Sequence, residues 1–358
     1  MAKEKRNNFA VLRLIAALMV LRGHMQYLIG SFPDSLLGEG IQAVGVHIFF
    51  LIGGYLITKS WCSDPHPIRY GLKRFFRIFP PLFFCVTFSA LIVGPLCTNL
   101  SIKDYFASPA LGAYFYNLRL FIVYNLPGVF TENPYPVAVN GSLWTLPVEV
   151  AMYLIVAVLL FLFSLMGKGE VRRRQGIGMA ATAILALLLR MYLFYPVWGW
   201  TDMVRYGTSL QSTIPLIPYY LLGSVYALVV PKEKLNLPLA LCAFLVTTTL
   251  LSGNPLFDVV RLLVLSYLVF SLAFAAPVLL LPSWMEISYG IYLFGFPIQQ
   301  TVVYFAQKWG WSLNNPNRLL AVSLLFILPL AFISEYLVER PAGKLCKKIC
   351  SFLENQGK

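Results

Sequence analysis

Apolar residues fill ten separate stretches of the chain, and polar residues gather between them. The stretches cover residues 9–29, 41–60, 80–97, 143–166, 177–195, 212–230, 237–251, 259–280, 287–306 and 319–338. Most have close to the ~20 residues that an α-helix needs to cross the hydrocarbon core of a bilayer. The pattern therefore predicts an all-α, polytopic integral membrane helix bundle with about ten transmembrane helices.

The composition agrees with a membrane location. Of the 358 residues, 58% are hydrophobic and 12% are charged, and the mean hydropathy is +0.72. A water-soluble domain cannot cover so much apolar surface. The formal net charge of +13 could suggest nucleic-acid binding, but the cations lie in short clusters between apolar stretches, as topology determinants do. We therefore expect a lipid bilayer, and no nucleic acid, as a partner.

The cysteine and histidine content argues against a metal centre. The six cysteines form no C-x-x-C pair, and the chain has only three histidines.

Arg13, Arg22 and His24 interrupt the first apolar stretch, and no small-x-small cleavage site follows it. We therefore expect this stretch to be retained as the first span and not removed as a signal peptide.

The basic clusters alternate along the predicted helices. Five groups fall on one side, and they comprise Lys3, Lys5 and Arg6; Arg69, Lys73, Arg74 and Arg77; Lys168, Arg172, Arg173 and Arg174; Lys232 and Lys234; and Lys344, Lys347 and Lys348. The opposite connections, of which residues 98–142 are the longest, carry only scattered cations. The positive-inside rule therefore places both termini in the cytoplasm. We expect one transmembrane domain over residues 1–343 and a short basic cytoplasmic tail over residues 344–358.

Among the ionisable residues that interrupt the apolar stretches, four have an informative placement. Arg13 and His24 are eleven positions apart, so they share one face of a helix about 16 Å apart along its axis. Counted at about 1.5 Å per residue, His24, His47 and Glu149 reach one layer near the outer ends of their spans. An imidazole beside a carboxylate suits general-base chemistry on a hydroxyl group. The alternative is a hydrogen-bonded network that fixes helix packing.

A basic segment leads into the third apolar stretch. Arg74 and Arg77 are i, i+3 neighbours on one helical face, and Lys73 precedes them. Guanidinium groups bind phosphate well, so a phosphorylated cytosolic donor could dock at this cytoplasmic mouth. The alternative is that these cations serve only as inside-positive charges.

The fourth apolar stretch opens with polar residues. Asn140 or Ser142 can cap the helix, and Pro147 is tolerated near its first turn. Trp144 suits the interfacial aromatic belt. These structural roles do not explain Glu149, which enters the apolar run.

Seven short motifs extend over nearly the whole chain. They read LRL to GH (residues 12–24), GVHIFF to GYLIT (45–58), RFFRIFP (74–80), LPGVF (126–130), GSLWTLPVE (141–149), ISYGIYLF (287–294) and VERP (338–341). In this order they resemble the acyltransferase-3 family, bacterial membrane O-acyltransferases that acetylate O-antigens, exopolysaccharides and related glycans of the cell envelope. The resemblance implies that His24 is the catalytic base, with Arg13 and Glu149 as the matching first-span arginine and acidic residue.

The same resemblance implies a donor. The family uses acetyl-CoA as its usual co-substrate, and its nucleotide would dock at Arg74 and Arg77, the family's R-x-x-R pair, with Lys73 beside them. The pantetheine arm would extend along the Arg13 face toward His24. No metal is implied.

Three positions depart from the family's pattern. His47 stands where many members have an acid, Gly53-Gly54 replaces a more usual Ser-Gly, and Gly295 stands where a histidine often follows the Tyr-Leu-Phe run. They affect the acceptor side, for which His47, Ser142 and Trp144 are the candidate residues.

The resulting hypothesis is an O-acetyltransferase of the bacterial inner membrane that transfers acetyl from acetyl-CoA to a hydroxyl of a cell-surface glycan or its lipid-linked precursor. The main alternative is a multi-span transporter or flippase, in which the same buried groups would line a substrate or proton pathway. Against it, the chain shows no inverted repeat. A non-catalytic scaffold would leave His24 and Glu149 without a role.

Overall fold

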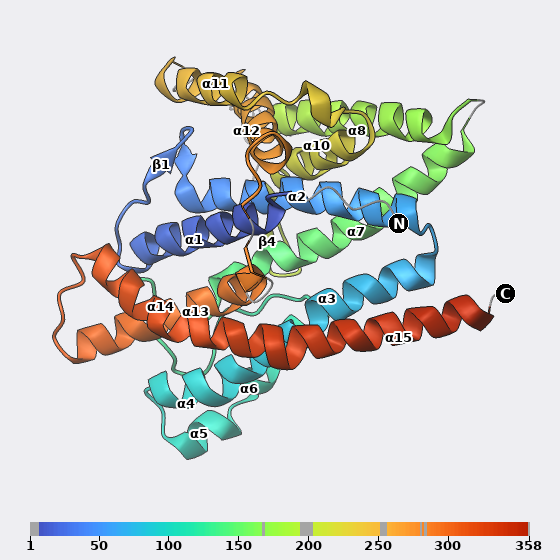
Figure 1. Ribbon diagram of the computed structural model, residues 1–358. Helices are drawn as coiled ribbons and strands as arrows, with labels where there is room; N and C mark the ends of the chain where they lie inside the picture. The colour runs from blue at the N-terminus through green and yellow to red at the C-terminus, as the bar shows by residue number, and fades with distance from the viewer. Residues whose placement is uncertain are drawn as a thin grey trace. The chain divides into compact units, whose positions relative to one another are not determined.

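The protein is built almost entirely of helices. The computed structural model describes residues 7–166, 169–193, 203–250, 256–279, 281–282 and 285–356. The helices are α1 (Phe9–Leu28), α2 (Ile41–Ser63), α3 (Pro67–Phe88), α4 (Gly94–Cys97), α5 (Ile102–Ala107), α6 (Pro109–Tyr114), α7 (Thr145–Leu165), α8 (Val171–Leu193), α9 (Leu210–Thr213), α10 (Leu216–Leu228), α11 (Leu237–Leu250), α12 (Leu256–Phe274), α13 (Ser288–Lys308), α14 (Pro316–Ile333) and α15 (Arg340–Gln356) (Figure 1). The described strands form two hairpins, β1 (Ser35–Leu36) with β2 (Glu39–Gly40) and β3 (Val204–Arg205) with β4 (Thr208–Ser209). The predicted all-α class is confirmed.

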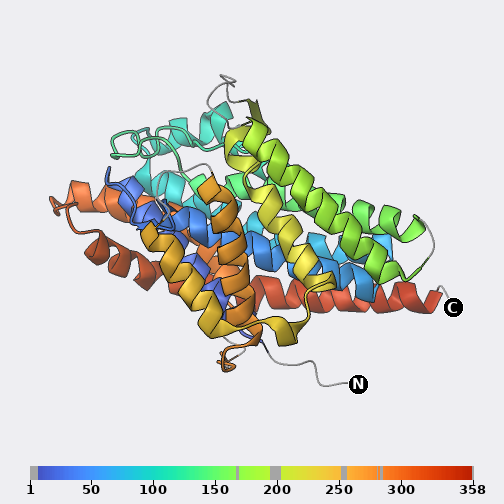
Figure 2. The same ribbon diagram turned by 90° about the horizontal axis from the view of Figure 1, so that it is seen from above.

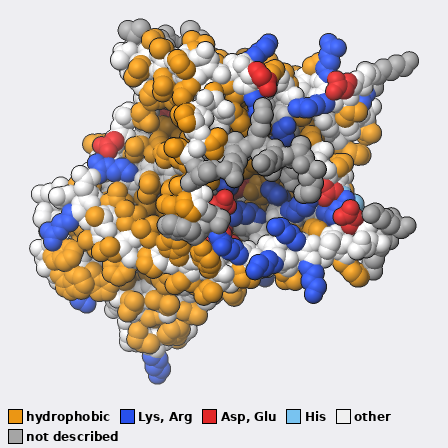
Figure 3. All heavy atoms as spheres, in the orientation of Figure 1, with side chains coloured by type: hydrophobic (Ala, Val, Ile, Leu, Met, Phe, Trp, Pro, Cys, Tyr) orange, Lys and Arg blue, Asp and Glu red, His pale blue; other side chains and the backbone are white. Residues whose placement is uncertain are grey.

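Seven helical segments of the described chain are long and apolar enough to cross a membrane. They are Phe9–Leu28, Ile41–Ser63, Pro67–Cys97, Gly141–Leu165, Val171–Leu193, Phe257–Phe274 and Pro316–Asn355. The face drawn in Figure 3 is accordingly rich in apolar side chains, with Lys and Arg in patches. By its apolar helices the chain is a multi-pass membrane protein.

The remaining predicted stretches, 212–230, 237–251 and 287–306, correspond to helices that are shorter or less apolar than these seven segments. At 13 and 14 residues, α10 and α11 are shorter than a bilayer requires, and glycine and glutamine dilute the apolar run of α13. The total of about ten crossings and the cytoplasmic termini stay predictions. Of the cations used to orient the chain, Lys3, Lys5, Arg6 and Lys168 lie outside the described residues.

The chain folds into two compact units. Unit 1 contains Met1–Ala16, Ser35–Pro65 and Val148–Pro282, and unit 2 contains Ala17–Asp34, His66–Pro147 and Ser283–Lys358. Helices α1 and α7 each run from one unit into the other. The predicted boundary at residues 343 and 344 falls inside α15, so the expected basic tail is the continuation of a helix.

In unit 1, α2 and α10 pack with their backbones in contact. A Cβ atom added to Gly54 would lie 1.9 Å from the Tyr220 carbonyl oxygen, and one added to Gly223 would lie 2.1 Å from the Leu51 carbonyl oxygen. Glycine is therefore required on both helices, as in other membrane interfaces built on small residues. The same unit holds α11 beside α12 (Figure 2).

We expect Gly54→Ala to destabilise the protein by about 3 kcal/mol or more, because the new methyl group meets backbone and not a movable side chain. Thermal unfolding of the purified protein in detergent measures this as a lower Tm. Gly71→Ala on α3 is the matched control, since nothing lies within 4 Å of a Cβ atom there. Equal Tm values for the two variants would contradict the close α2–α10 packing.

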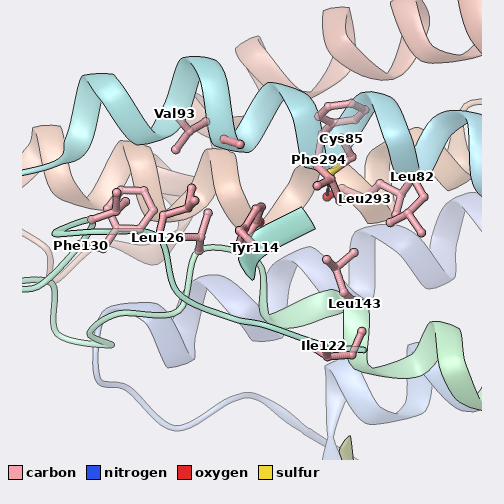
Figure 4. Packing of buried hydrophobic residues seen from close by; sticks show 14 of the residues in the cluster. Leu82, Cys85, Val93, Tyr114, Ile122, Leu126, Phe130, Leu143, Leu293 and Phe294 are labelled. Atoms are coloured by element: carbon pink, nitrogen blue, oxygen red, sulfur yellow. Dashed lines mark hydrogen bonds between the residues drawn. The ribbon is translucent and has the colours of Figure 1, made fainter. Parts of the chain in front are cut away.

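Unit 2 is centred on a cluster of buried apolar side chains. Figure 4 shows Cys85 of α3 beside Phe294 at one end of this cluster and Phe130 beside Leu126 at the other. The long connection over residues 98–142 supplies several members, and the Tyr105 hydroxyl donates to the Ala90 carbonyl at 2.6 Å. This connection is therefore part of the packed unit.

Helices α3 and α15 lie side by side in unit 2 (Figure 1). The helical segment Pro316–Asn355 has 40 residues and includes a π-helical turn, η7 (Ser334–Glu339). It is about 60 Å long at 1.5 Å per residue, about twice the hydrocarbon thickness of a bilayer. One end of the segment must therefore lie outside the apolar layer, and the exposed lysines of α15 mark that end, namely Lys344, Lys347 and Lys348.

Candidate active site

His24 lies in the last two turns of α1, within unit 2, and its side chain is half-buried. Its Nδ1 atom is buried and makes no hydrogen bond to the described residues. The imidazole packs edge-on against Phe296 of α13, with centroids 5.2 Å apart and an interplanar angle of 77°. Gln299 of α13 donates to the Leu21 carbonyl at 2.8 Å and ties the two helices together beside the histidine. Packing, and not a hydrogen bond to Nδ1, therefore holds this ring.

The segment before α7 approaches the same aromatic ring. A Cβ atom on Gly141 would lie 2.6 Å from the Phe296 ring, so any larger residue here would displace that ring. Asn140 caps the 3₁₀ turn η3 (Gly141–Trp144) by accepting from the Ser142 N–H at 3.1 Å, and it also donates to the Leu293 carbonyl at 2.9 Å. Phe296 is thus shared by the histidine and the G-S-L-W motif, a connection that sequence spacing does not reveal.

Ser142 and Trp144, two candidate acceptor residues, sit in this turn. The Ser142 carbonyl accepts from the Tyr292 hydroxyl at 2.9 Å. The Ser142 hydroxyl oxygen is buried and makes no hydrogen bond to the part of the chain that the structure describes. Trp144 is half-buried. Contact of either residue with an acceptor stays a prediction.

The glycine at position 295 has a packing reason. A Cβ atom there would lie 2.2 Å from Leu21 Cδ2 on α1. Position 295 therefore faces α1 closely, and the Leu21 side chain occupies the space that a larger residue would need. Gly54 has a similar reason in the α2–α10 contact of unit 1.

Arg13 and Glu149, the predicted companions of His24, belong to unit 1. Arg13 is half-buried on α1, eleven residues before the histidine on the same continuous helix. Glu149, in the second turn of α7, is also half-buried and accepts a short hydrogen bond from the Tyr153 hydroxyl one turn later. Their catalytic roles stay predictions.

The basic pair of α3 has protein partners. Arg77 Nη1 lies 2.8 Å from Glu339 Oε2 of η7, and its guanidinium lies 5.0 Å from the Tyr289 ring centroid. Arg74 lies over the Tyr70 ring, 5.8 Å from its centroid. The sequence reading did not give Glu339 a role, although it stands in the V-E-R-P motif. Arg77 therefore joins α3 to η7, and phosphate binding by Arg74, Arg77 and Lys73 stays a prediction.

His47 belongs to a different polar group, entirely within unit 1. Its Nδ1 lies 3.2 Å from Glu39 Oε2, and its ring stacks on Tyr219 with centroids 3.9 Å apart. Glu39 also pairs with Arg261 of α12. Burial raises the pKa of the Glu39 carboxyl, and the charge of Arg261 opposes that shift. Sequence reasoning missed Arg261 and its neighbours because single charges in apolar stretches far apart in the chain give no sign of their pairing.

Comparison with known proteins identifies the family of the chain. A family model described as an acyltransferase domain matches residues 6–336. The chain is 28% identical over 347 residues to an "O-acetyl transferase" of Shigella phage Sf6, covering 94% of this chain and 96% of the phage protein. It is 29% identical over 375 residues to "Nodulation protein 10" of Rhizobium leguminosarum bv. viciae, covering 95% and 94%. No solved structure matches the chain.

The chain therefore belongs to the acyltransferase-3 family, and it is a membrane acyltransferase of the O-acetyltransferase type. This membership confirms the resemblance carried by the seven motifs. It also decides between the enzyme and the transporter or scaffold alternatives in favour of the enzyme.

Proposed function

We propose that this enzyme transfers an acetyl group from acetyl-CoA, bound at the cytoplasmic side of the bacterial inner membrane, to a hydroxyl of a cell-surface glycan or its lipid-linked precursor. The observation that carries the proposal is His24, a half-buried imidazole in a membrane helix whose Nδ1 makes no hydrogen bond to the described residues. Burying a polar group in a membrane costs free energy, and hydrogen bonds usually offset that cost. An imidazole whose buried nitrogen has no such bond is therefore better explained by a role in the reaction.

The proposed chemistry is general-base catalysis. His24 takes the proton of the acceptor hydroxyl while the oxygen attacks the thioester carbonyl carbon. The new C–O bond forms the acetyl ester, the C–S bond breaks, and the imidazolium returns the proton to the departing CoA thiolate. Glu149 is proposed to stabilise the imidazolium, and Arg13 to line the path of the pantetheine arm.

The donor is proposed to bind through its phosphate groups. Arg74 and Lys73 lie close to Cys346 of α15, and the exposed Lys347 follows that cysteine. A nucleotide carrying several phosphates suits such a concentration of cations.

Mass spectrometry of surface glycans tests the function. The protein is expressed in a bacterium whose polysaccharides carry no O-acetyl groups, and we expect a mass increment of one acetyl group that mild alkali removes. The purified protein should release CoA thiol from acetyl-CoA when that glycan is added. Unchanged glycan masses in several hosts with different polysaccharides, despite correct insertion of the protein, would contradict the proposal.

A further inference from the structure

Five charged or titratable side chains meet within unit 1, and we call them the Arg261 cluster. They are Glu39 of β2, His47 of α2, Arg190 of α8, and Asp258 and Arg261 of α12. Arg261 pairs with both Glu39 and Asp258, and Arg190 Nη2 lies 3.2 Å from Asp258 Oδ2. Three segments distant in sequence, β2 with the adjoining α2, α8 and α12, therefore converge on one polar site.

The β1–β2 hairpin brings Glu39 into the cluster. Its turn residues Leu37 and Gly38 have φ angles of 55° and 73°, as a two-residue hairpin turn requires. The Leu37 carbonyl accepts from Arg261 Nη1 at 3.3 Å. A Cβ atom on Gly38 would lie 2.8 Å from the Phe257 ring, so the turn is seated directly on α12. The hydrogen bond from Arg261 and the contact with Phe257 thus fix the turn that positions Glu39.

The cluster contains more hydrogen-bonding capacity than it uses. Two buried guanidinium atoms, Arg190 Nη1 and Arg261 Nε, make no hydrogen bond to the described residues. Glu39 Oε2 and His47 Nδ1 lie 3.2 Å apart and also lack a hydrogen bond of regular geometry. His47, Arg190 and Arg261 are only 3%, 6% and 4% exposed. Buried polar atoms in folded proteins nearly always have partners, so two unsatisfied guanidinium atoms beside a poorly bonded imidazole–carboxylate contact indicate that a polar ligand completes the cluster.

The chemistry of these atoms defines the ligand. Two guanidinium groups and two carboxylates cancel in formal charge, so the cluster favours neither an anion nor a cation. It offers N–H donors from the arginines, acceptor oxygens from Glu39 and an imidazole from His47. A sugar hydroxyl both donates and accepts, and vicinal hydroxyls would satisfy several of these atoms together.

Access to the cluster is from the protein surface. The side chains of Asp258 and Glu39 are 43% and 22% exposed, whereas His47 lies deeper and is held flat against Tyr219. A ligand would therefore enter past the carboxylates and meet the imidazole last. We propose that the Arg261 cluster binds vicinal hydroxyls of a neutral sugar and is the acceptor-recognition site of this enzyme, an inference that rests on the proposed function.

The test uses the full-length protein in lipid nanodiscs. Methyl α-D-glucopyranoside, methyl β-D-galactopyranoside and methyl α-L-rhamnopyranoside are titrated without acetyl-CoA, and Tm is measured at each concentration. We expect at least one glycoside to raise the Tm of the wild-type protein. In Glu39→Gln, which keeps the size of the side chain but removes its charge, we expect the half-saturating concentration to rise about tenfold or more. Arg190→Lys, which replaces the guanidinium group by an ammonium group on a shorter side chain, should also raise the half-saturating concentration.

Glu233→Gln is the matched control, because Glu233 is an exposed carboxylate elsewhere in unit 1. Stabilisation of the wild type by none of the three glycosides, or the same half-saturating concentration in Glu39→Gln and wild type, would overturn the inference. Acetyl transfer to the stabilising glycoside is then measured separately. Saturable stabilisation that Glu39→Gln weakens, without any acetyl transfer by the wild type, would leave the sugar site standing and reject the proposed function.

Discussion

Replacing His24 by alanine is expected to lower kcat/KM for acetyl transfer by about a thousandfold or more, because a positioned general base contributes about 10²–10⁴-fold. The loss should appear in kcat, while the KM for acetyl-CoA stays close to the wild-type value. The removed imidazole leaves a space beside Phe296, since the two rings are in edge-to-face contact. Added imidazole should therefore restore part of the activity, which a purely structural role would not allow.

His66→Asn is the control for the loss of a histidine. His66 caps α3 by accepting from the Arg69 N–H at 3.4 Å, and asparagine can cap in the same way. This variant should retain near wild-type transfer. Normal acetylation by His24→Ala, or an equal loss in His66→Asn, would reject His24 as the catalytic base.

Removing Arg77 is expected to destabilise unit 2. The Glu339 side chain is 6% exposed, so Arg77→Ala would remove the guanidinium partner of a buried carboxylate. Breaking a fully buried pair costs about 3–5 kcal/mol. Because the Arg77 side chain is 40% exposed, we expect a smaller decrease in the free energy of unfolding, about 2 kcal/mol.

A double-mutant cycle separates this structural role from donor binding. Glu339→Gln removes the buried charge, so adding it to Arg77→Ala should recover at least about 1 kcal/mol of the lost stability. The KM for acetyl-CoA should rise in Arg77→Ala and stay unchanged in Glu339→Gln if Arg77 also contacts a donor phosphate. Lys344→Ala, an exposed cation on α15, is the stability control. Additive effects of the two substitutions would contradict the ion pair.

Hydropathy predicts the membrane helices well where the whole helix is apolar. The stretches predicted at 9–29 and 41–60 correspond to α1 and α2. The stretch predicted from residue 80 begins earlier, at Pro67, because His66 caps an amphipathic basic turn that hydropathy does not detect. Likewise α14 continues through η7 into α15, whose polar residues end the apolar signal but not the helix.

For the candidate site, residue types were predictable and their partners were not. Charged and imidazole groups in apolar stretches are conspicuous because the bilayer penalises them, which singled out Arg13, His24, His47 and Glu149. Phe296 is the structural neighbour of His24, but one more phenylalanine in an apolar helix carries no such signal. Arg77 was predicted from its spacing, whereas its partner Glu339 lies 262 residues away.

By itself the sequence determined that this is a multi-pass, all-α membrane acyltransferase, because apolar length, basic alternation and ordered motifs are local properties of the chain. Only the tertiary structure decided that Phe296 joins His24 to the G-S-L-W turn, that Arg77 pairs with Glu339, and that His47 belongs to the Arg261 cluster. The physical reason is that such contacts depend on which helix faces pack together, and that is fixed by close packing at residues such as Gly54, Gly141 and Gly295, whose missing side chains leave no periodic signal in the sequence.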